Sequence, residues 1–372
     1  MKKILFGFLL LFLIIPKVSA TDLAPSASSV MVMEPTTGKI IYERNSHERR
    51  HPASMTKIMT MLLVMESIEK GMIGWEDIVT VSENASRMGG SQILLETGEQ
   101  MNVYDLFKGL SVASGNDAAV ALAEKIAGSE EEFVNMMNKR ASELGLLDTN
   151  FKNCHGLDEA NHYSSAYDMS IMAKELVKHE KVFEFTSIYE DYLRKGTDRS
   201  FWLVNTNKLV KFYPGVDGLK TGYTNEAGFC ITATAKKNDM RIITVVMGEP
   251  DTKTRNADVS SVFDYVYAQY GLNKIIDKNQ ILDTVKVEKG KKETVDIIST
   301  VDISDLYKKA DGLVDVTYEM NIDKIKAPIK KGDVVGKLTL SDGRTIDLTV
   351  KEDVEKANIF EMFYRNFINT IN

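Results

Sequence analysis

The chain has few of the residues that hold small or metal-dependent folds together. Its 372 residues include only two cysteines, two tryptophans, five histidines and seven prolines. Two cysteines cannot form a disulfide framework or a four-cysteine metal site, and the histidines predict no helical zinc site. The chain has no basic run and its net charge is −7, so nothing favours a nucleic acid as a partner. The composition implies neither a metal nor an organic cofactor.

Long apolar runs are also scarce, and the one that occurs stands at the amino terminus. It extends from Ile4 to Ile15, after Lys2 and Lys3 and before the small residues Val18-Ser19-Ala20. Twelve residues are too few for a typical membrane span, and the flanks are those of a secretory signal peptide. We therefore predict a signal peptide at residues 1–20, with an uncleaved anchor as the alternative. The protein is expected to work outside the cytoplasm.

The whole chain has a globular composition, with 44% hydrophobic and 27% charged residues. Between residues 21 and 274, strand patterns stand at both ends and helical patterns lie between them. This order predicts an α/β or α+β domain. The expected strands are 29–33, 39–43, 228–235 and 241–247, and the expected helices are 54–69, 103–110, 118–126, 131–144, 166–179 and 258–270.

After residue 274 the sequence changes to short β-rich runs separated by Gly-Lys, Lys-Gly-Asp and Ser-Asp-Gly-Arg turns. These runs predict a small all-β domain at residues 275–352. The domain has no cluster of nucleophile, base and metal-ligand types, so we expect a spacing or docking role. The expected strands are 285–288, 294–298, 314–320, 334–340 and 344–350.

The last segment, residues 353–372, is amphipathic. Phe360, Phe363, Phe367 and Ile371 recur there at helical spacing. We interpret it as a helix that anchors the protein to a membrane surface, with packing against the β domain as the alternative. The anchored protein would lie in the cell envelope, on the outer face of the cytoplasmic membrane.

Three short motifs point to catalysis by a serine nucleophile. Ser54-Met55-Thr56-Lys57 is an S-x-x-K motif at the start of a helical pattern, Ser114-Gly115-Asn116 is S-x-N, and Lys220-Thr221-Gly222 is the only K-T-G. On a helix, residues i and i+3 share a face, so the lysine amine can lie beside the serine hydroxyl. A lysine acts as a base only when it is neutral, which requires burial or a second cation nearby.

Two of these motifs are weak signals when taken alone. Residues 67–70 also match S-x-x-K, and residues 82–84 also match S-x-N. The ordered set of three, on a helix, a loop and a strand, is far more specific. The chain has no G-x-S-x-G elbow, which disfavours an α/β-hydrolase.

With these motifs, residues 25–270 resemble the penicillin-recognising serine enzymes. They are most similar to the low-molecular-mass penicillin-binding proteins, which are serine-type D-alanyl-D-alanine carboxypeptidases. The resemblance implies a catalytic domain with the fold of the penicillin-recognising transpeptidases and β-lactamases, and the β-rich tail also fits this family. The blocks that carry it are residues 52–57, 114–117, 155–157, 163–166 and 218–222.

The resemblance also implies roles for individual residues. Ser54 would be the acylated nucleophile, Lys57 its base, Ser114 a proton relay and Asn116 a holder of the substrate amide. Lys220 would supply the second cation. The backbone N–H groups of Ser54 and Tyr223 would form an oxyanion hole. The substrate-binding residues would be Thr221, Gly222, Tyr223 and Arg255, with Thr221 and Arg255 on the terminal carboxylate.

The implied reaction removes the terminal D-alanine from peptidoglycan stem pentapeptides through a Ser54 acyl-enzyme, and β-lactam antibiotics would acylate the same serine. Endopeptidase action on cross-links would use the same residues and stays open. A β-lactamase would need a glutamate in an E-x-x-L-N context, which the chain lacks. A catalytically silent cell-wall binding module is the non-enzymatic alternative.

Four other residues are interpreted as structural. His155 shows no spacing of a triad base. Asp168 is expected to complete a capping box with Ser165. Cys154 and Cys230 could form a disulfide, but Cys230 falls in an apolar strand, so we favour two free thiols.

Overall fold

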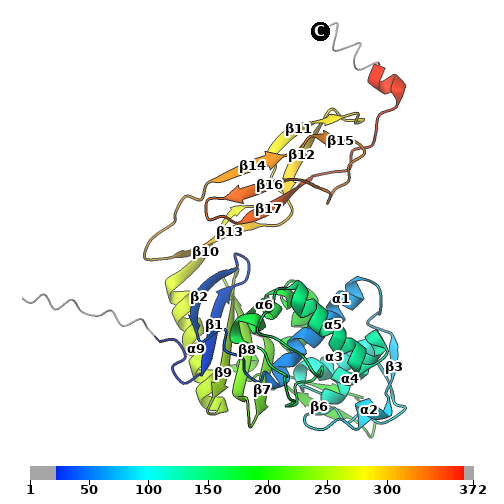
Figure 1. The fold of residues 1–372 in the computed structure, drawn as a ribbon, viewed down its shortest axis with the longest axis vertical. Coiled ribbons are helices and arrows are strands. Elements are labelled where there is room, and N and C mark those ends of the chain that lie inside the picture. The colour runs from blue at the N-terminus through cyan, green and yellow to red at the C-terminus, as the bar shows by residue number, and fades with distance from the viewer. Residues whose placement is uncertain (1–21, 364–372) are drawn as a thin grey trace, which may run out of the picture.

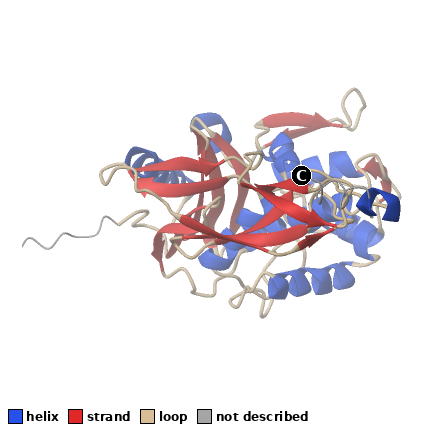
Figure 2. Ribbon diagram, turned by 90° about the horizontal axis from the view of Figure 1, so that it is seen from above, coloured by secondary structure: helices blue, strands red, loops and turns tan. Residues whose placement is uncertain are grey.

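The computed structural model describes residues 22–363, which form a larger α+β domain and an elongated β domain (Figure 1). The expected signal peptide lies outside the described residues, as do Phe367 and Ile371. Seen from above, the strands of the β domain lie nearest the viewer (Figure 2). Both predicted fold classes are confirmed.

A five-stranded antiparallel sheet is the centre of the larger domain. Its strands follow the order β2 (Lys39–Arg44), β1 (Ser29–Glu34), β9 (Met240–Glu249), β8 (Gly228–Lys237) and β7 (Val216–Thr224). The strands from the two ends of the domain therefore meet in one sheet. β7 is an edge strand, so one side of it is not paired with another strand.

Side chains alternate across the sheet and feed two hydrophobic cores. On β1, Met31 and Met33 enter the core on one face, whereas Val30 and Val32 enter the core on the other. In Figure 1, α9 lies on one side of the sheet and most other helices lie on the opposite side. The helical elements are η1 (Ala53–Thr56), α1 (Lys57–Glu69), α2 (Glu83–Ser86), α3 (Val103–Val112), α4 (Asn116–Ala127), α5 (Glu130–Glu143), α6 (Ala166–Leu176), η2 (Glu180–Val182), α7 (Phe183–Thr186), α8 (Leu209–Phe212) and α9 (Thr252–Gln269).

Three helix boundaries differ from the sequence prediction by three or more residues. The expected helix 54–69 opens with a 3-10 turn, η1, and becomes α-helical at Lys57. α6 stops at Leu176, because the following backbone tightens and His179 N–H donates to the Leu176 carbonyl. α9 begins six residues early, because Asp251 caps it by accepting a hydrogen bond from Thr254 N–H.

Two small hairpins flank the helices, and the sequence analysis did not predict them. β3 (Ile78–Thr80) pairs with β4 (Gln100–Asn102), and β5 (Glu190–Leu193) pairs with β6 (Phe201–Val204). Their strands have only three or four residues, too few for a clear alternating pattern.

The β domain contains a six-stranded sheet in the order β14-β16-β17-β12-β11-β15. A separate pair, β10 (Tyr270–Ile276) and β13 (Ile303–Lys308), joins it to the larger domain and was not predicted. The expected strand 314–320 begins only at Tyr318. The sheet strands are β11 (Asp283–Glu288), β12 (Thr294–Ser299), β14 (Tyr318–Ile322), β15 (Ile325–Lys326), β16 (Val334–Leu340) and β17 (Thr345–Val350).

The carboxyl-terminal segment is described as far as residue 363. Residues 359–363 are helical, and the side chains of Phe360 and Phe363 are largely exposed. Within residues 22–363, none of the helices combines the length and the apolar character that crossing a bilayer requires. The anchoring role of this segment stays a prediction.

Candidate active site

Ser54 and Lys57 meet at the junction of η1 and α1. Ser54 is partly exposed, whereas the Lys57 side chain is completely buried. Lys57 Nζ lies 3.1 Å from Ser54 Oγ, 2.6 Å from Asn116 Oδ1 and 2.7 Å from the His155 carbonyl oxygen. The amine therefore has three oxygen neighbours, and one of them is the serine hydroxyl.

Burial changes the proton affinity of this amine. It lowers the pKa of Lys57 to about 7, because the interior disfavours the charged form. A substantial fraction of Lys57 is therefore neutral near neutral pH. A neutral amine has two N–H groups and one lone pair, and these match the two protein acceptors and the Ser54 hydroxyl.

Two glycines allow neighbouring backbone segments to pack closely on both sides of η1, the turn that carries Ser54. Gly156 has a φ of +91°, and a Cβ there would lie 1.9 Å from the Ala53 carbonyl oxygen. A Cβ on Gly222, the last residue of K-T-G, would lie 2.8 Å from the Pro52 carbonyl oxygen and 3.1 Å from Ala53 Cβ. Glycine at both positions lets the backbones of the 155–157 loop and β7 approach η1.

The S-x-N motif forms the opposite wall. Ser114 has a left-handed backbone (φ +64°), and its buried Oγ has no hydrogen-bond partner within the described residues. Asn116, the first residue of α4, accepts from Lys57 through Oδ1 and donates to the Gly89 carbonyl through Nδ2. These contacts show Asn116 orienting the lysine and the 89–90 loop. Its predicted contact with a substrate amide stays a prediction.

The K-T-G motif lies on the edge strand β7, next to η1. Lys220 is buried, and its Nζ donates to the Thr221 carbonyl. Burial holds the pKa of Lys220 well below its ordinary value, and repulsion from Lys57 and Arg255 acts in the same direction. Thr221 Oγ1 donates to Thr206 Oγ1 at 2.8 Å.

Tyr223 follows the K-T-G motif, and 53% of this residue is exposed. The ring packs on Phe229 with 4.3 Å between centroids, and the hydroxyl donates to Asn225. The side chain is therefore positioned by β8 and the turn that follows β7.

Arg255 lies on the first turn of α9 rather than in a loop, and only 3% of it is exposed. Its Nη1 donates to the Cys230 carbonyl at 3.4 Å, and its Nε and Nη2 donate to Asn256 Oδ1. Because Cys230 pairs with Gly222 across β8 and β7, the guanidinium lies one strand behind the K-T-G motif. Burial lowers the pKa of Arg255 to about 10.

The structural interpretations are largely confirmed. Both cysteines are buried and free. Burial lowers the pKa of His155 to about 3, so its ring is neutral, while its backbone carbonyl holds Lys57. Ser165 caps α6 as expected. Asp168, however, does not complete the capping box, because its carboxylate accepts from Asp148 N–H and Thr149 Oγ1 in the preceding loop.

Sequence analysis missed three contacts that shape the site. They come from the His155 carbonyl, the Gly89 carbonyl and the Thr206 hydroxyl. Two are backbone atoms, which no residue type reveals. Thr206 sits in a segment without a motif, and only the tertiary pairing with Thr221 identifies it.

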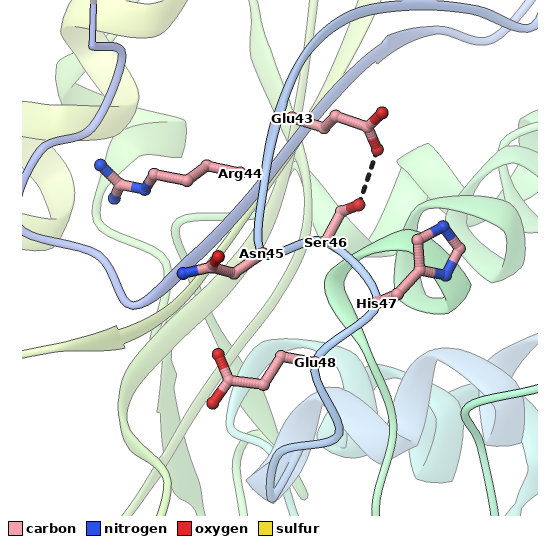
Figure 3. Close-up of a pocket in the computed structure, with 6 residues that line it drawn as sticks. All are labelled: Glu43, Arg44, Asn45, Ser46, His47 and Glu48. Carbon is pink, nitrogen blue, oxygen red and sulfur yellow. Dashed lines mark hydrogen bonds between the residues drawn. The ribbon is translucent and has the colours of Figure 1, made fainter.

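A surface hollow outside this site follows β2 and is lined by residues 43–48 (Figure 3). His47 and His51 have the four-residue spacing of a helical zinc pair, but they lie in this non-helical turn region. Their rings approach different carboxylates, Asp148 and Asp158 respectively. Among residues 22–363 no group of three or more His, Cys, Asp or Glu side chains is arranged to hold a metal ion.

Comparison with known proteins gives the family. A family model described as D-alanyl-D-alanine carboxypeptidase matches residues 17–251. The D-alanyl-D-alanine carboxypeptidase DacF of Bacillus subtilis is 53% identical over 350 residues, which cover 93% of this chain and 90% of that protein. The chain belongs to the D-alanyl-D-alanine carboxypeptidase family. It is therefore a serine peptidase, and the binding-module alternative is set aside.

The carboxyl-terminal domain of the chain also matches a domain of penicillin-binding proteins. Residues 270–356 match the carboxyl-terminal domain of penicillin-binding protein 5. Penicillin-binding protein 5 of Haemophilus influenzae has a similar structure, with a TM-score of 0.72 and 32% identity over 91% of this chain and all of that chain. Ampicillin-bound penicillin-binding protein D2 of Listeria monocytogenes is similar over 64% of this carboxypeptidase and 96% of its own chain, with a TM-score of 0.58 and 30% identity.

Proposed function

We propose that this carboxypeptidase removes the terminal D-alanine from peptidoglycan stem pentapeptides through an acyl-enzyme on Ser54. The observation that carries the proposal is the placement of the buried Lys57 amine, 3.1 Å from Ser54 Oγ, with a pKa of about 7. The family supports the substrate class. The neutral amine accepts the Ser54 proton while its two N–H groups donate to Asn116 Oδ1 and the His155 carbonyl oxygen.

Acylation then proceeds on the side of the serine that faces β7. Ser54 Oγ attacks the carbonyl carbon of the penultimate D-alanine, and the N–H groups of Ser54 and Tyr223 receive the oxyanion. Preorganised donors of this kind are worth roughly 3 kcal/mol each. The proton held by Lys57 passes to the departing D-alanine nitrogen. Ser114 Oγ, which is buried and has no hydrogen-bond partner within residues 22–363, would relay it. Water then attacks the ester and frees Ser54.

The cationic side of the site binds the end of the substrate. Lys220, Thr221 and Arg255 would attract and hold the terminal carboxylate. Lys220 is too buried to interact with bulk water, and its only protein acceptor in the described chain is a backbone carbonyl. An incoming carboxylate would therefore supply a charge partner that this buried amine lacks.

We also propose that β-lactams acylate Ser54, that the chain is exported, and that its carboxyl-terminal helix holds it at the membrane surface. Similarity to an ampicillin-bound relative supports the first point. The basic, apolar start of the sequence supports the second, and the exposed Phe360 and Phe363 support the third.

Mass spectrometry after exposure to benzylpenicillin tests the nucleophile. We expect one covalent adduct on Ser54, no adduct in Ser54→Ala, and none in Lys57→Ala, which lacks the base. Ser67→Ala is the matched control, because residues 67–70 have the same S-x-x-K pattern, and it should label normally. An adduct that persists in Ser54→Ala or maps to Ser67 would contradict the assignment.

A further inference from the structure

The outward face of the β5–β6 hairpin carries two exposed aromatic side chains. Tyr192 and Trp202 stand directly opposite each other in the antiparallel register, and 46% and 56% of their surfaces are exposed. Directly opposite residues lie on the same face of a sheet with their Cβ atoms about 5 Å apart. Glu190, two residues before Tyr192, shares this face. We call Glu190, Tyr192 and Trp202 the aromatic face.

The side chains of the aromatic face have no partner in the described chain. Among residues 22–363, neither ring stacks on another ring, and neither the Tyr192 hydroxyl nor the Trp202 indole N–H makes a hydrogen bond. The Glu190 carboxylate likewise has no ion pair or hydrogen bond within those residues. Exposed aromatic rings with free polar groups are typical of a binding surface rather than of packing.

The chain that carries Trp202 leads from this face to the active site. β6 ends at Val204, and the chain bends at Thr206, two residues later. Thr206 accepts the hydrogen bond from Thr221 of the K-T-G motif. Trp202 is four residues from Thr206, so even a fully extended chain would separate them by at most about 14 Å.

The far end of the hairpin is fixed against the other wall of the site. Arg194 Nη1 donates to the Ile93 carbonyl, and its Nε pairs with Glu99 at 2.5 Å. The 91–93 segment in turn binds the S-x-N wall, because Asn116 N–H donates to the Ser91 carbonyl. These contacts therefore fix the hairpin, and with it the aromatic face, against the segment that binds the S-x-N wall.

We infer that the aromatic face binds the glycan strand of peptidoglycan, as a platform outside the catalytic centre. The inference rests on the proposed function, because stem peptides reach the enzyme attached to such strands. The C–H faces of N-acetylated sugar rings pack on aromatic rings, and their hydroxyls can donate to a free carboxylate such as Glu190. The same carboxylate disfavours polyanions, because it would repel a phosphate backbone.

Direct titration with a soluble β-1,4-linked N-acetylglucosamine oligomer tests the platform. We expect saturable binding to the full protein that is weakened about threefold to tenfold in Trp202→Ala and largely retained in Trp202→Phe, which keeps a ring. Tyr318→Ala removes an exposed ring from β14 and is the matched control, which should bind like the unaltered protein. No binding by the unaltered protein, or equal binding by Trp202→Ala, would overturn the inference.

Kinetics on two substrates give the second test. One substrate is a short acylated peptide ending in D-Ala-D-Ala, and the other is a stem pentapeptide carried on a disaccharide chain. Trp202→Ala should lower the ratio of kcat/KM between the glycan-linked and free substrates about threefold to tenfold, and Trp202→Phe should restore most of it. An unchanged ratio would show that the face binds something else, such as a protein. If the unaltered enzyme hydrolyses neither substrate, the proposed function fails, while the oligosaccharide titration still decides the platform.

Discussion

Acylation by benzylpenicillin should depend on pH as the deprotonation of Lys57 does. The amine is completely buried, and burial lowers its pKa to about 7. A base with this pKa is neutral in about 1% of molecules at pH 5, half of them at pH 7 and about 99% at pH 9. The second-order acylation rate constant should therefore rise about a hundredfold from pH 5 to pH 9 and level off above pH 8. A lysine of ordinary pKa would be neutral in only about 0.03% of molecules at pH 7, so burial increases the reactive fraction more than about a thousandfold.

Stopped-flow or gel measurement of adduct formation across this range is the assay. His155 and His162 have pKa values lowered to about 3 and about 4, so neither titrates in the window. Glu249 does titrate in this pH range, because burial and the neighbouring Asp258 raise its pKa to about 7. Glu249→Gln is therefore the matched control, and its profile should keep the same midpoint. A flat profile, a midpoint above pH 9, or a midpoint that disappears in Glu249→Gln would refute the reasoning.

Three further outcomes are expected. Gly156→Ala should lower the free energy of unfolding by more than about 3 kcal/mol in a denaturant melt. Gly312 also has a positive φ but has open space around it, so Gly312→Ala should lower the free energy of unfolding by only about 1 kcal/mol. Similar losses in the two variants would contradict the close contact between Gly156 and Ala53. Arg255→Ala should reduce kcat/KM on a D-Ala-D-Ala peptide about tenfold to a hundredfold and affect the carboxyl-terminal amide much less, and equal losses would make Arg255 structural. Truncation after Asn358 should release the protein from the membrane fraction, and unchanged recovery there would disprove the anchor.

The sequence predicted the larger domain well because its elements are long and strongly patterned. β1, β8 and β9 have buried, apolar positions through most of the strand, whereas the residues of β2 are half-buried or exposed. The expected bounds of all four strands were within a few residues. The short strands β3 to β6 have too few residues to show a period. The sequence analysis did not predict β10 and β13 for another reason. These strands are defined by pairing with each other across 27 or more residues of chain, and the local sequence pattern does not show such a pairing.

The sequence predicted which side chains meet at the site, but it could not predict which backbone groups contact them. Ser54, Lys57, Asn116 and Lys220 lie together because their motifs fall on elements that converge, and three ordered motifs carry that information. The carbonyls that hold Lys57 and Asn116 belong to His155 and Gly89, and any residue type supplies a carbonyl. For the same reason, the roles of Gly156 and Gly222 appear only when the closeness of the neighbouring backbone is known.

The burial that suits Lys57 to its proposed role as the base also lowers the free energy of unfolding at neutral pH. Its pKa is about 7 in the folded protein and ordinary, about 10.5, in the unfolded chain. Between these values the unfolded chain binds more protons than the folded protein, so the free energy of unfolding rises with pH across this window. The shift corresponds to roughly 5 kcal/mol, a large share of the total stability of an ordinary domain. The two close-packed glycine contacts and the converging hydrogen bonds at Lys57 Nζ hold the amine in place against this penalty. The proposed reactivity at neutral pH and the reduced stability there therefore have the same physical cause, the removal of one amine from water.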